Sequence, residues 1–207
     1  MVNDIRIYIE GGGRSDHTKT LMRQGFSEFF RELVTIARER RVDWRIVACG
    51  SRENAFRAFQ IALKANPKAF NVLLVDSEEA VSQPPWQHLA MRDNWARPQG
   101  ATDAHCQFMV QCMEAWIIAD RNALRAFYGL NFLPNALPQP RNVESTDKVA
   151  IANHLERATR NTQKGEYHKI NHGTKLLAKI DPRIVRAACP HCERFFVTLT
   201  GKMTEDT

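Results

Sequence analysis

Three carboxylates follow two predicted strands and form the most informative pattern in this sequence. Glu10 ends the alternating segment 5–9, while Asp76 ends the apolar run 72–75 and Glu78 lies two positions further on. Because the carboxyl ends of parallel strands meet at one edge of a sheet, we expect the three acids to lie close together. Their mutual repulsion favours a hard divalent cation with oxygen ligands, so the spacing predicts a Mg²⁺ site, with Mn²⁺ as an alternative ion. A single acid at a strand end is also common as a solvated edge residue.

The first of these acids is followed directly by Gly11, Gly12 and Gly13. A backbone without side chains can turn sharply after a strand and direct its N–H groups at an anionic oxygen. The run lacks the lysine and serine of a P-loop and the glycine spacing of a dinucleotide fold, so alone it is a weak signal. Together with the acids, it predicts contact with a phosphate.

Composition limits the class of protein. The chain has 207 residues, of which 43% are hydrophobic and 25% charged, and it carries a formal charge of +6. These values are typical of a folded globular protein and exclude collagen-like, disulfide-scaffold and wholly disordered chains. The sequence has no apolar run long enough for a membrane span or an export signal, and its five scattered cysteines favour reduced thiols, so we expect a cytoplasmic location. The positive charge favours an anionic partner such as nucleic acid.

Hydrophobic periodicity in the first half predicts strands that alternate with helices. Strands are expected at 5–10, 44–49, 72–76 and 107–111, and helices at 17–41 and 52–65. Strand–helix alternation over the first 76 residues is the pattern of a parallel sheet with helices packed on it, and therefore of the α/β class. The segment 82–104 contains several prolines and no sustained period, so it is predicted to be a long loop or lid.

The second half is predicted to be mostly helical. Helices are expected at 112–128 with a break near Asp120, then at 145–159, 174–180 and 190–199, with a proline-rich connection at 129–141 and frayed residues from Gly201 onward. We therefore expect a core at 1–128 that includes the 82–104 loop, and a helical extension at 129–207 packed on that core as one compact unit.

Several runs in this sequence resemble known families. IEGGG at 9–13 and LLVDSE at 73–78 resemble the two signature motifs of the TOPRIM domain, the metal-binding fold of topoisomerases, bacterial primases and nucleases of the overcoming-lysogenisation-defect type. The runs RIVACGSRENA, PWQHL, MVQCMEAWIIAD and KGEYHK resemble a TOPRIM-like family of small bacterial proteins known as domain of unknown function 4276. The resemblance extends from about Ile5 to Phe196 and implies a mostly parallel sheet of about four strands.

The resemblance also implies roles for individual acids. Glu10 takes the position of the TOPRIM glutamate, which is a metal ligand or a general acid/base, and Asp76 and Glu78 take the acid-x-acid positions that hold Mg²⁺. The second acid is a glutamate instead of the commoner aspartate, and its extra methylene changes the geometry of the ligand set. Glu114 lies where related nuclease families carry a glutamate after the fourth strand, and is a further candidate for the catalytic group.

A second group of candidate residues lies in the run KGEYHK and just beyond it. Lysines can hold phosphate as point charges and histidine can donate to a bridging or leaving oxygen, although such a run is also typical of a solvated basic loop. With the family resemblance, we expect an element that faces the phosphate. Its catalytic candidates are His168 and Lys169, and its phosphate-binding candidates are Lys164, Tyr167 and His172, joined by Arg52 and Asn54 after the second strand.

Two further features have structural interpretations. Cys189 and Cys192 have C-x-x-C spacing with His191 between them, but no second pair completes the four ligands of a structural zinc, so reduced thiols are favoured. Trp86 follows two prolines in the predicted loop and is a candidate for stacking on a base, whereas Trp116 lies on an apolar helical face and is expected in the core.

The function expected from these observations is Mg²⁺-dependent hydrolysis of nucleic acid phosphodiesters. The chain contains no Walker motif, so an ATPase would be a separate protein, as in bacterial anti-phage or DNA-processing systems that use TOPRIM nucleases. A homodimer is a further candidate assembly. The alternative is a non-catalytic module that binds a metal, a nucleotide or nucleic acid and regulates a partner.

Overall fold

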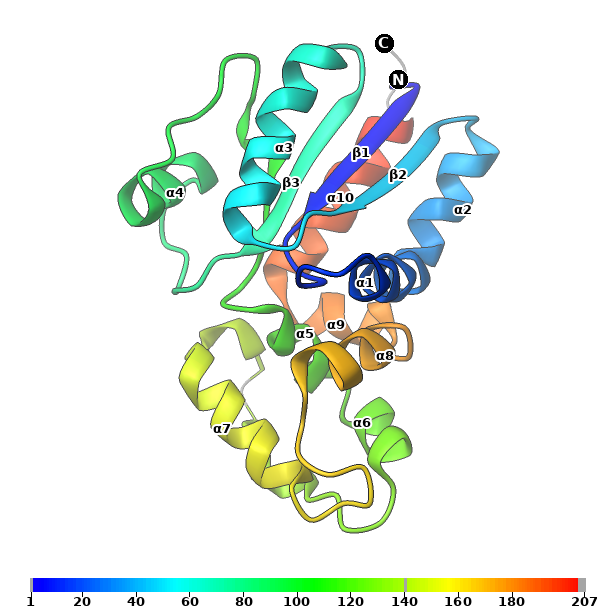
Figure 1. The fold of residues 1–207 in the computed structure, drawn as a ribbon, viewed down its shortest axis with the longest axis vertical. Helices are drawn as coiled ribbons and strands as arrows, with labels where there is room; N and C mark the ends of the chain where they lie inside the picture. Colours follow the sequence, from blue (N-terminus) through cyan, green and yellow to red (C-terminus); the bar gives the residue numbers. More distant parts are fainter. Residues whose placement is uncertain (1, 140, 205–207) are drawn as a thin grey trace.

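The fold is built on a four-stranded parallel sheet. In the computed structural model, which describes residues 2–139 and 141–204, the strands are β1 (Asp4–Ile9), β2 (Asp43–Ala48), β3 (Phe70–Asp76) and β4 (Cys106–Met109), in the order β2-β1-β3-β4. All three strand pairs are parallel. The predicted α/β class is confirmed, including the helical C-terminal region, part of which lies below the strands in Figure 1.

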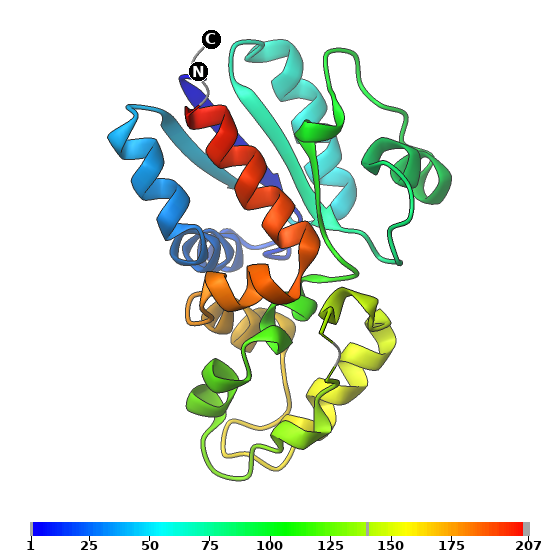
Figure 2. The same cartoon turned by 180° about the vertical axis from the view of Figure 1, so that it is seen from behind.

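Helices cover both faces of this sheet. On one face lie α1 (Asp16–Phe29), α2 (Arg31–Glu39) and α10 (Pro190–Thr204), and on the other lie α3 (Arg52–Ala65) and α4 (Pro85–Asp93). Figure 2 shows α10 crossing the back of the sheet. Every residue of β3 is buried, because this strand is central and covered on both faces. Its uninterrupted apolar sequence is the pattern that such a strand requires.

The larger of two cores lies between the sheet and α1, α2 and α10. Ile5, Ile7 and Ile9 point into it from β1, in agreement with the alternation in the sequence. Trp116 is completely buried there, and its ring stacks on Phe29 with the centroids 5.2 Å apart. The predicted core position of Trp116 is therefore confirmed.

The predicted helix over 17–41 is wrong in one respect, because two helices occupy this segment. The first ends at Phe29 and the second begins at Arg31, with Phe30 between them. Phe29 packs against Trp116, while Phe30 stacks on Phe195 at 4.7 Å between centroids. The break allows two consecutive phenylalanines to be buried in the same core, where both also contact the ring of Phe196.

The predicted long loop at 82–104 is also wrong in part, because it contains α4. Pro85 occupies the first turn of this helix, where its fixed φ is favourable and its missing N–H costs no hydrogen bond. Trp86 is 4% exposed, stacks on Phe59 and donates its indole N–H to the carbonyl oxygen of Thr102 at 2.9 Å. Trp86 is therefore a core residue of the second face, and its predicted role in stacking on a base is not supported.

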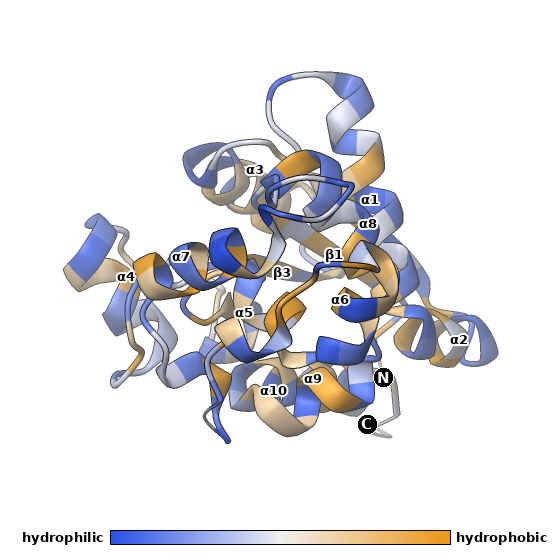
Figure 3. Ribbon diagram, turned by 90° about the horizontal axis from the view of Figure 1, so that it is seen from below, coloured by the Kyte–Doolittle hydropathy of each residue, from blue (hydrophilic) through white to orange (hydrophobic). Residues whose placement is uncertain are grey.

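The second half forms a series of short helices around the carboxyl end of the sheet. They are α5 (Met113–Ala119), α6 (Arg121–Tyr128), α7 (Lys148–Thr159), α8 (Thr174–Leu177) and α9 (Pro182–Ala188), with a π-helical turn at Lys169–Gly173 and 3-10 turns at Asp103–His105, Pro134–Ala136 and Val143–Ser145. The predicted break at Asp120 is confirmed, since its carboxylate accepts the N–H of Ala123 at the start of α6. Figure 3 shows the molecule from this end.

The C-terminal helix is longer than predicted. It continues to Thr204 because Met203 is buried in the core and the carbonyl oxygen of Lys202 accepts the N–H of Val2 at 3.3 Å. The expected fraying from Gly201 is therefore wrong for residues 201–204, and its remaining residues, 205–207, lie outside the described part of the chain. The structure also adds α9, for which no helix was predicted.

The C-x-x-C pair lies inside this packing. Cys189 and Cys192 are free thiols with no exposed surface, and burial raises the pKa of both. His191, between them, points elsewhere, since its Nδ1 lies 2.6 Å from the carboxylate of Glu144. The two thiols therefore act as small apolar core residues. Separately, none of the helices described in residues 2–139 and 141–204 has the length and apolar character needed to cross a membrane.

Trp116→Ala should lower the free energy of unfolding by about 3 to 5 kcal/mol, because it removes a fully buried ring from the main core. Urea denaturation followed by circular dichroism measures this change. Met91→Ala is the control, since Met91 is 75% exposed on α4 and should change stability by less than about 0.5 kcal/mol. Equal effects of the two variants would contradict the assignment of Trp116 to the core.

Candidate metal centre

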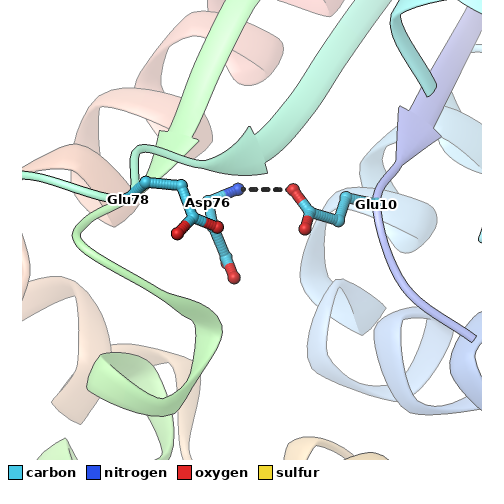
Figure 4. A group of neighbouring side chains, drawn as sticks. All are labelled: Glu10, Asp76 and Glu78. Carbon is cyan, nitrogen blue, oxygen red and sulfur yellow. Dashed lines mark hydrogen bonds between the residues drawn. The ribbon is translucent and has the colours of Figure 1, made fainter. Parts of the chain in front are cut away.

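Three acids meet at the carboxyl end of the central strands. Glu10 follows β1, Asp76 is the last residue of β3, and Glu78 lies two residues beyond it. One carboxylate oxygen from each lies within 4.8 Å of the others, and Figure 4 shows the side chains directed toward a common space. The pairing of β1 with β3 causes this arrangement, because it places the two strand ends side by side.

The backbone beyond β3 keeps Glu78 close to this site. The N–H of Ser77 donates to the carbonyl oxygen of Met109 at 3.0 Å, and the N–H of Glu78 donates to that of Gln111 at 2.8 Å. Glu78 has a φ of 69°, in the left-handed region that non-glycine residues rarely adopt. The chain therefore turns at Glu78, and this residue stays next to the end of β3.

Asp76 is the most deeply buried of the three acids. Its side chain is 1% exposed, and its Oδ1 accepts the N–H of Met113 at 2.8 Å while its Oδ2 lies 3.3 Å from Nζ of Lys169. Burial, assisted by the negative charges of Glu10 and Glu114, raises the pKa of Asp76 to about 7, against the opposing effect of Lys169. The carboxylate is therefore costly to ionise unless a cation lies beside it.

Glu10 is held by the guanidinium of Arg52. Its Oε2 accepts the backbone N–H of Asp76 at 3.3 Å and lies 3.4 Å from Nη1 of Arg52. Arg52 also forms a two-point contact with Asp93, at 2.7 and 3.2 Å, and packs over the ring of Trp95. The orientation of Glu10 thus depends on α4, which supplies Asp93.

Glu78 is paired with two basic residues from different elements. Its Oε2 lies 2.5 Å from Nζ of Lys148 on α7 and 3.8 Å from Nη2 of Arg92 on α4. Partial burial on its own would raise the pKa of Glu78, but the hydrogen bond and charge of Lys148 lower it below the ordinary value. Glu78 therefore remains ionised over a wider pH range than Asp76.

Glu114 lies next to the three-acid cluster and is linked to it by Lys169. The Tyr167 hydroxyl donates to Oε1 of Glu114 at 3.0 Å, and Nζ of Lys169 lies 3.7 Å from its Oε2. Because Lys169 also contacts Asp76, its ammonium lies between two buried carboxylates, which raise its pKa despite the opposing effect of burial. Lys169 is the residue of the KGEYHK run that reaches the acids directly.

The predicted glycine turn follows Glu10 and has a structural role. Gly11, Gly12 and Gly13 all have positive φ, and Gly11 forms a two-way backbone bridge with Gly50 at 2.8 and 3.0 Å. A Cβ on Gly12 would lie only 2.8 Å from Cα of Lys19. A cavity of about 190 Å³ lies beside the turn, lined by these glycines together with Glu10, Asp76 and Lys169.

Other residues of the predicted phosphate-facing group have contacts away from the acid cluster. The ammonium of Lys164 lies over the ring of Phe127, 5.2 Å from its centroid. Nδ1 of His168 accepts the N–H of Asn171 at 3.1 Å and so begins the π-helical turn, while Nδ1 of His172 lies 3.0 Å from the hydroxyl of Tyr128. These contacts position the segment that carries Lys169, and the phosphate contact predicted for Lys164, His168 and His172 stays a prediction.

The two residues predicted after the second strand differ in position. Arg52 reaches the acid cluster as described, but Asn54 is exposed on α3 and its N–H is bonded to the side chain of Ser51, which caps that helix. The predicted contribution of Asn54 to the site is therefore not supported.

Lys148, Arg92 and Asp93 reach the site without having been predicted. Lys148 is the first residue of α7 and contacts Glu78 across 70 positions of sequence. Arg92 and Asp93 come from α4, which lies in the segment predicted to be a loop. Pro85 is the sequence signal that could have indicated the start of this helix, because proline is favourable in a first helical turn.

The fold and this cluster define an α/β protein with acids and basic residues gathered at the carboxyl edge of a parallel sheet. The chain matches the model of the family described as Domain of unknown function (DUF4276) over residues 9–200, so it belongs to that family, and the predicted resemblance to this family is confirmed. No curated protein and no solved structure matches the chain.

The donor set fits a hard divalent cation. All three side chains offer carboxylate oxygen, which Mg²⁺ and Mn²⁺ prefer, and the oxygens are close enough to share one ion. Asp76 in particular is buried with a carboxylate that needs a neighbouring positive charge. The ammonium groups of Lys148 and Lys169 supply that charge to the cluster in this structure.

In EDTA, the free energy of unfolding of Asp76→Asn relative to that of the native chain should rise by about 1 to 3 kcal/mol between pH 4 and pH 8. An unfolded aspartate ionises at about pH 4. Folded Asp76 keeps its proton up to about pH 7, so its contribution to stability falls as the pH rises between these values. Urea denaturation at pH 4, 6 and 8 measures the difference.

Asp43→Asn is the matched control, because Asp43 is exposed at the start of β2. Its difference from the native chain should stay below about 0.5 kcal/mol at every pH. A stability difference between Asp76→Asn and the native chain that does not rise between pH 4 and pH 8 would contradict the raised pKa of Asp76.

Proposed function

We propose that this protein is a Mg²⁺-dependent phosphodiester hydrolase that acts on nucleic acid. The observation that carries the proposal is the meeting of Glu10, Asp76 and Glu78, whose carboxylate oxygens lie within 4.8 Å of one another at the carboxyl edge of the sheet. The net charge of +6 is favourable for binding a polyanion.

Glu10, Asp76 and Glu78 would hold the ion. A bound Mg²⁺ supplies Lewis-acid polarisation of a phosphoryl oxygen and lowers the pKa of a coordinated water, and Mn²⁺ can supply the same chemistry. Arg52 keeps Glu10 oriented through its contacts with Asp93 and the end of β3. The ligands are thus positioned by neighbours that are themselves fixed by packing and ion pairs.

Two lysines are placed to bind the substrate phosphate. Nζ of Lys169 lies beside Asp76 and Glu114, and Nζ of Lys148 lies beside Glu78. From these positions each ammonium can donate to a non-bridging phosphate oxygen at the edge of the acid cluster. The Tyr167 hydroxyl holds Glu114 in place, so its role is to position a neighbour of Lys169.

A non-catalytic binding or regulatory module is the second candidate. It is favoured by the fact that each acid of the cluster already has a basic partner: Arg52 for Glu10, Lys169 for Asp76 and Lys148 for Glu78. Such a network can be electrostatically satisfied without an ion, and the same surface could then dock a nucleotide or nucleic acid without turnover.

The proposed setting follows from the TOPRIM resemblance. We propose a cytoplasmic bacterial defence or DNA-processing system in which a separate ATPase supplies nucleotide hydrolysis, since the chain contains no Walker motif. A second copy of this chain is a further candidate partner. These assignments rest on likeness to TOPRIM nucleases and on the motifs that carry it.

Glu10→Gln should reduce metal-dependent cleavage of labelled DNA or RNA by about 100-fold or more, because it removes a charged ligand while keeping the shape of the side chain. Cleavage by the native chain should require Mg²⁺ or Mn²⁺ and disappear in EDTA. Glu39→Gln, at the exposed end of α2, is the control and should cleave at the native rate.

The same two variants test metal binding without any substrate. Mg²⁺ at about 100 times its Kd should stabilise the native chain and Glu39→Gln by about 2.7 kcal/mol, and should stabilise Glu10→Gln much less. Metal-dependent stabilisation without cleavage, even with a candidate ATPase present, would favour the regulatory module. The absence of both effects would contradict the metal centre itself.

A further inference from the structure

A second and larger pocket lies beside the metal centre. Its volume is about 350 Å³, and Lys169 and Glu114 line it on the side of the acid cluster. Lys169 also lines the cavity next to Glu10 and Asp76, so this one side chain borders both spaces. Another wall is α7, which lines the pocket with its residues at 148, 151, 152, 153 and 156.

The end of the pocket next to the metal centre carries two ammonium groups and the carboxylate of Glu114. Lys148, at the first turn of α7, contacts Glu78 of the metal centre, and Lys169 contacts Asp76. Both ammonium groups therefore lie at the boundary between the pocket and the three acids. A phosphate that approaches the metal centre would meet this end of the pocket first.

The other end of the pocket is acidic. Glu156 lies eight residues after Lys148, about 12 Å further along the axis of α7. Glu166 lies near the same end of the helix, because the N–H of the adjacent Tyr167 donates to the hydroxyl of Thr159 at 2.8 Å. Both glutamates are exposed, and among residues 2–139 and 141–204 neither carboxylate forms an ion pair.

A largely apolar surface, which also includes Asn153 of α7, connects the two ends. Ile151 and Ala152 line the pocket from α7, and Cys112 lines it from the start of α5. The thiol of Cys112 is buried, and burial raises its pKa, so it presents a neutral surface. This succession of a lysine-bearing end, a largely apolar middle and an acidic end limits the class of ligand that fits.

Phosphate is excluded from the acidic end by repulsion but is favoured at the lysines. A group at the acidic end can donate hydrogen bonds to the glutamates, and the part of the ligand in the middle must pack against apolar side chains. A nucleobase has these properties, and the edge of guanine offers adjacent N–H donors that a carboxylate can accept together. The volume is at the lower limit of small-ligand pockets, which suits one nucleotide.

We propose that this pocket binds one unpaired nucleotide next to the scissile phosphate, with a preference for guanine through Glu156 and Glu166. The proposal rests on the proposed hydrolase function and specifies its substrate as single-stranded nucleic acid. A base in a duplex cannot enter the pocket, because its Watson–Crick edge is already paired and its faces are stacked.

The test measures binding in EDTA by fluorescence anisotropy, with the full chain and labelled 12-nucleotide strands. The strands consist of thymine with a single central guanine, cytosine, adenine or thymine, and the guanine strand is also presented as a duplex. The guanine strand should bind about tenfold or more tightly than the thymine strand and than its own duplex. Equal binding of all strands, or tighter binding of the duplex, would overturn the proposal.

Variants locate the preference in the pocket. The double variant Glu156→Gln/Glu166→Gln should lose the guanine preference, while Glu39→Gln should retain it in full. Ala152→Phe fills the pocket from an exposed position of α7 and should weaken binding of the guanine strand about tenfold or more. A double variant that binds all four strands more tightly and equally would also overturn the proposal, because it would show that the glutamates only repel phosphate.

Two further measurements distinguish this proposal from binding of a free nucleotide and from the hydrolase function itself. Guanosine monophosphate should compete weakly with the guanine strand, and competition at equal affinity would assign the pocket to a free nucleotide and overturn the substrate proposed here. Glu10→Gln should keep the guanine preference, since Glu10 lies outside this pocket. A guanine preference without any cleavage in Mg²⁺ would support the pocket while refuting the hydrolase.

Discussion

The arrangement of charge at the carboxyl edge of the sheet is the constraint on which this structure depends. Parallel pairing of β1 with β3 brings Glu10 and Asp76 together, and the left-handed turn at Glu78 adds a third carboxylate. Such a group is tolerated only with positive charge beside it. Arg52, Lys148 and Lys169 supply that charge from α3, α7 and the π-helical turn. These ion pairs, which neutralise the carboxylates, thereby connect three separate elements to one edge of the sheet.

The sequence was sufficient for features that depend on local pattern. The alternation of isoleucines in β1, the apolar run of β3 and the break at Asp120 each reflect a short-range rule, and each was predicted. The meeting of the acids also follows from a general rule, because parallel strands end at one edge. In contrast, α4 was missed because Pro84 and Pro85 suggested a loop, although proline in the first turn is favourable for starting a helix.

Contacts between side chains that are far apart in the sequence could not be predicted from the sequence. Nothing near Lys148 indicates that it contacts Glu78, 70 positions away. The KGEYHK run illustrates the same limit, since Lys169 reaches Asp76 while Lys164 packs on Phe127 and His168 caps a turn. Residue type predicted a basic element near phosphate, but only the π-helical turn determines which of these side chains is directed at the acids.

The order of the charged residues along the chain has a consequence for biosynthesis. Glu10, Asp76 and Glu78 are translated before Lys148 and Lys169, and Asp76 precedes its lysine by 93 positions. A nascent chain that has left the ribosome only as far as β4 carries the acids without these two partners. Docking of α7 and the π-helical turn must therefore be a late event. A chain on a ribosome stalled before that point would expose the three carboxylates without the ammonium groups of these two lysines.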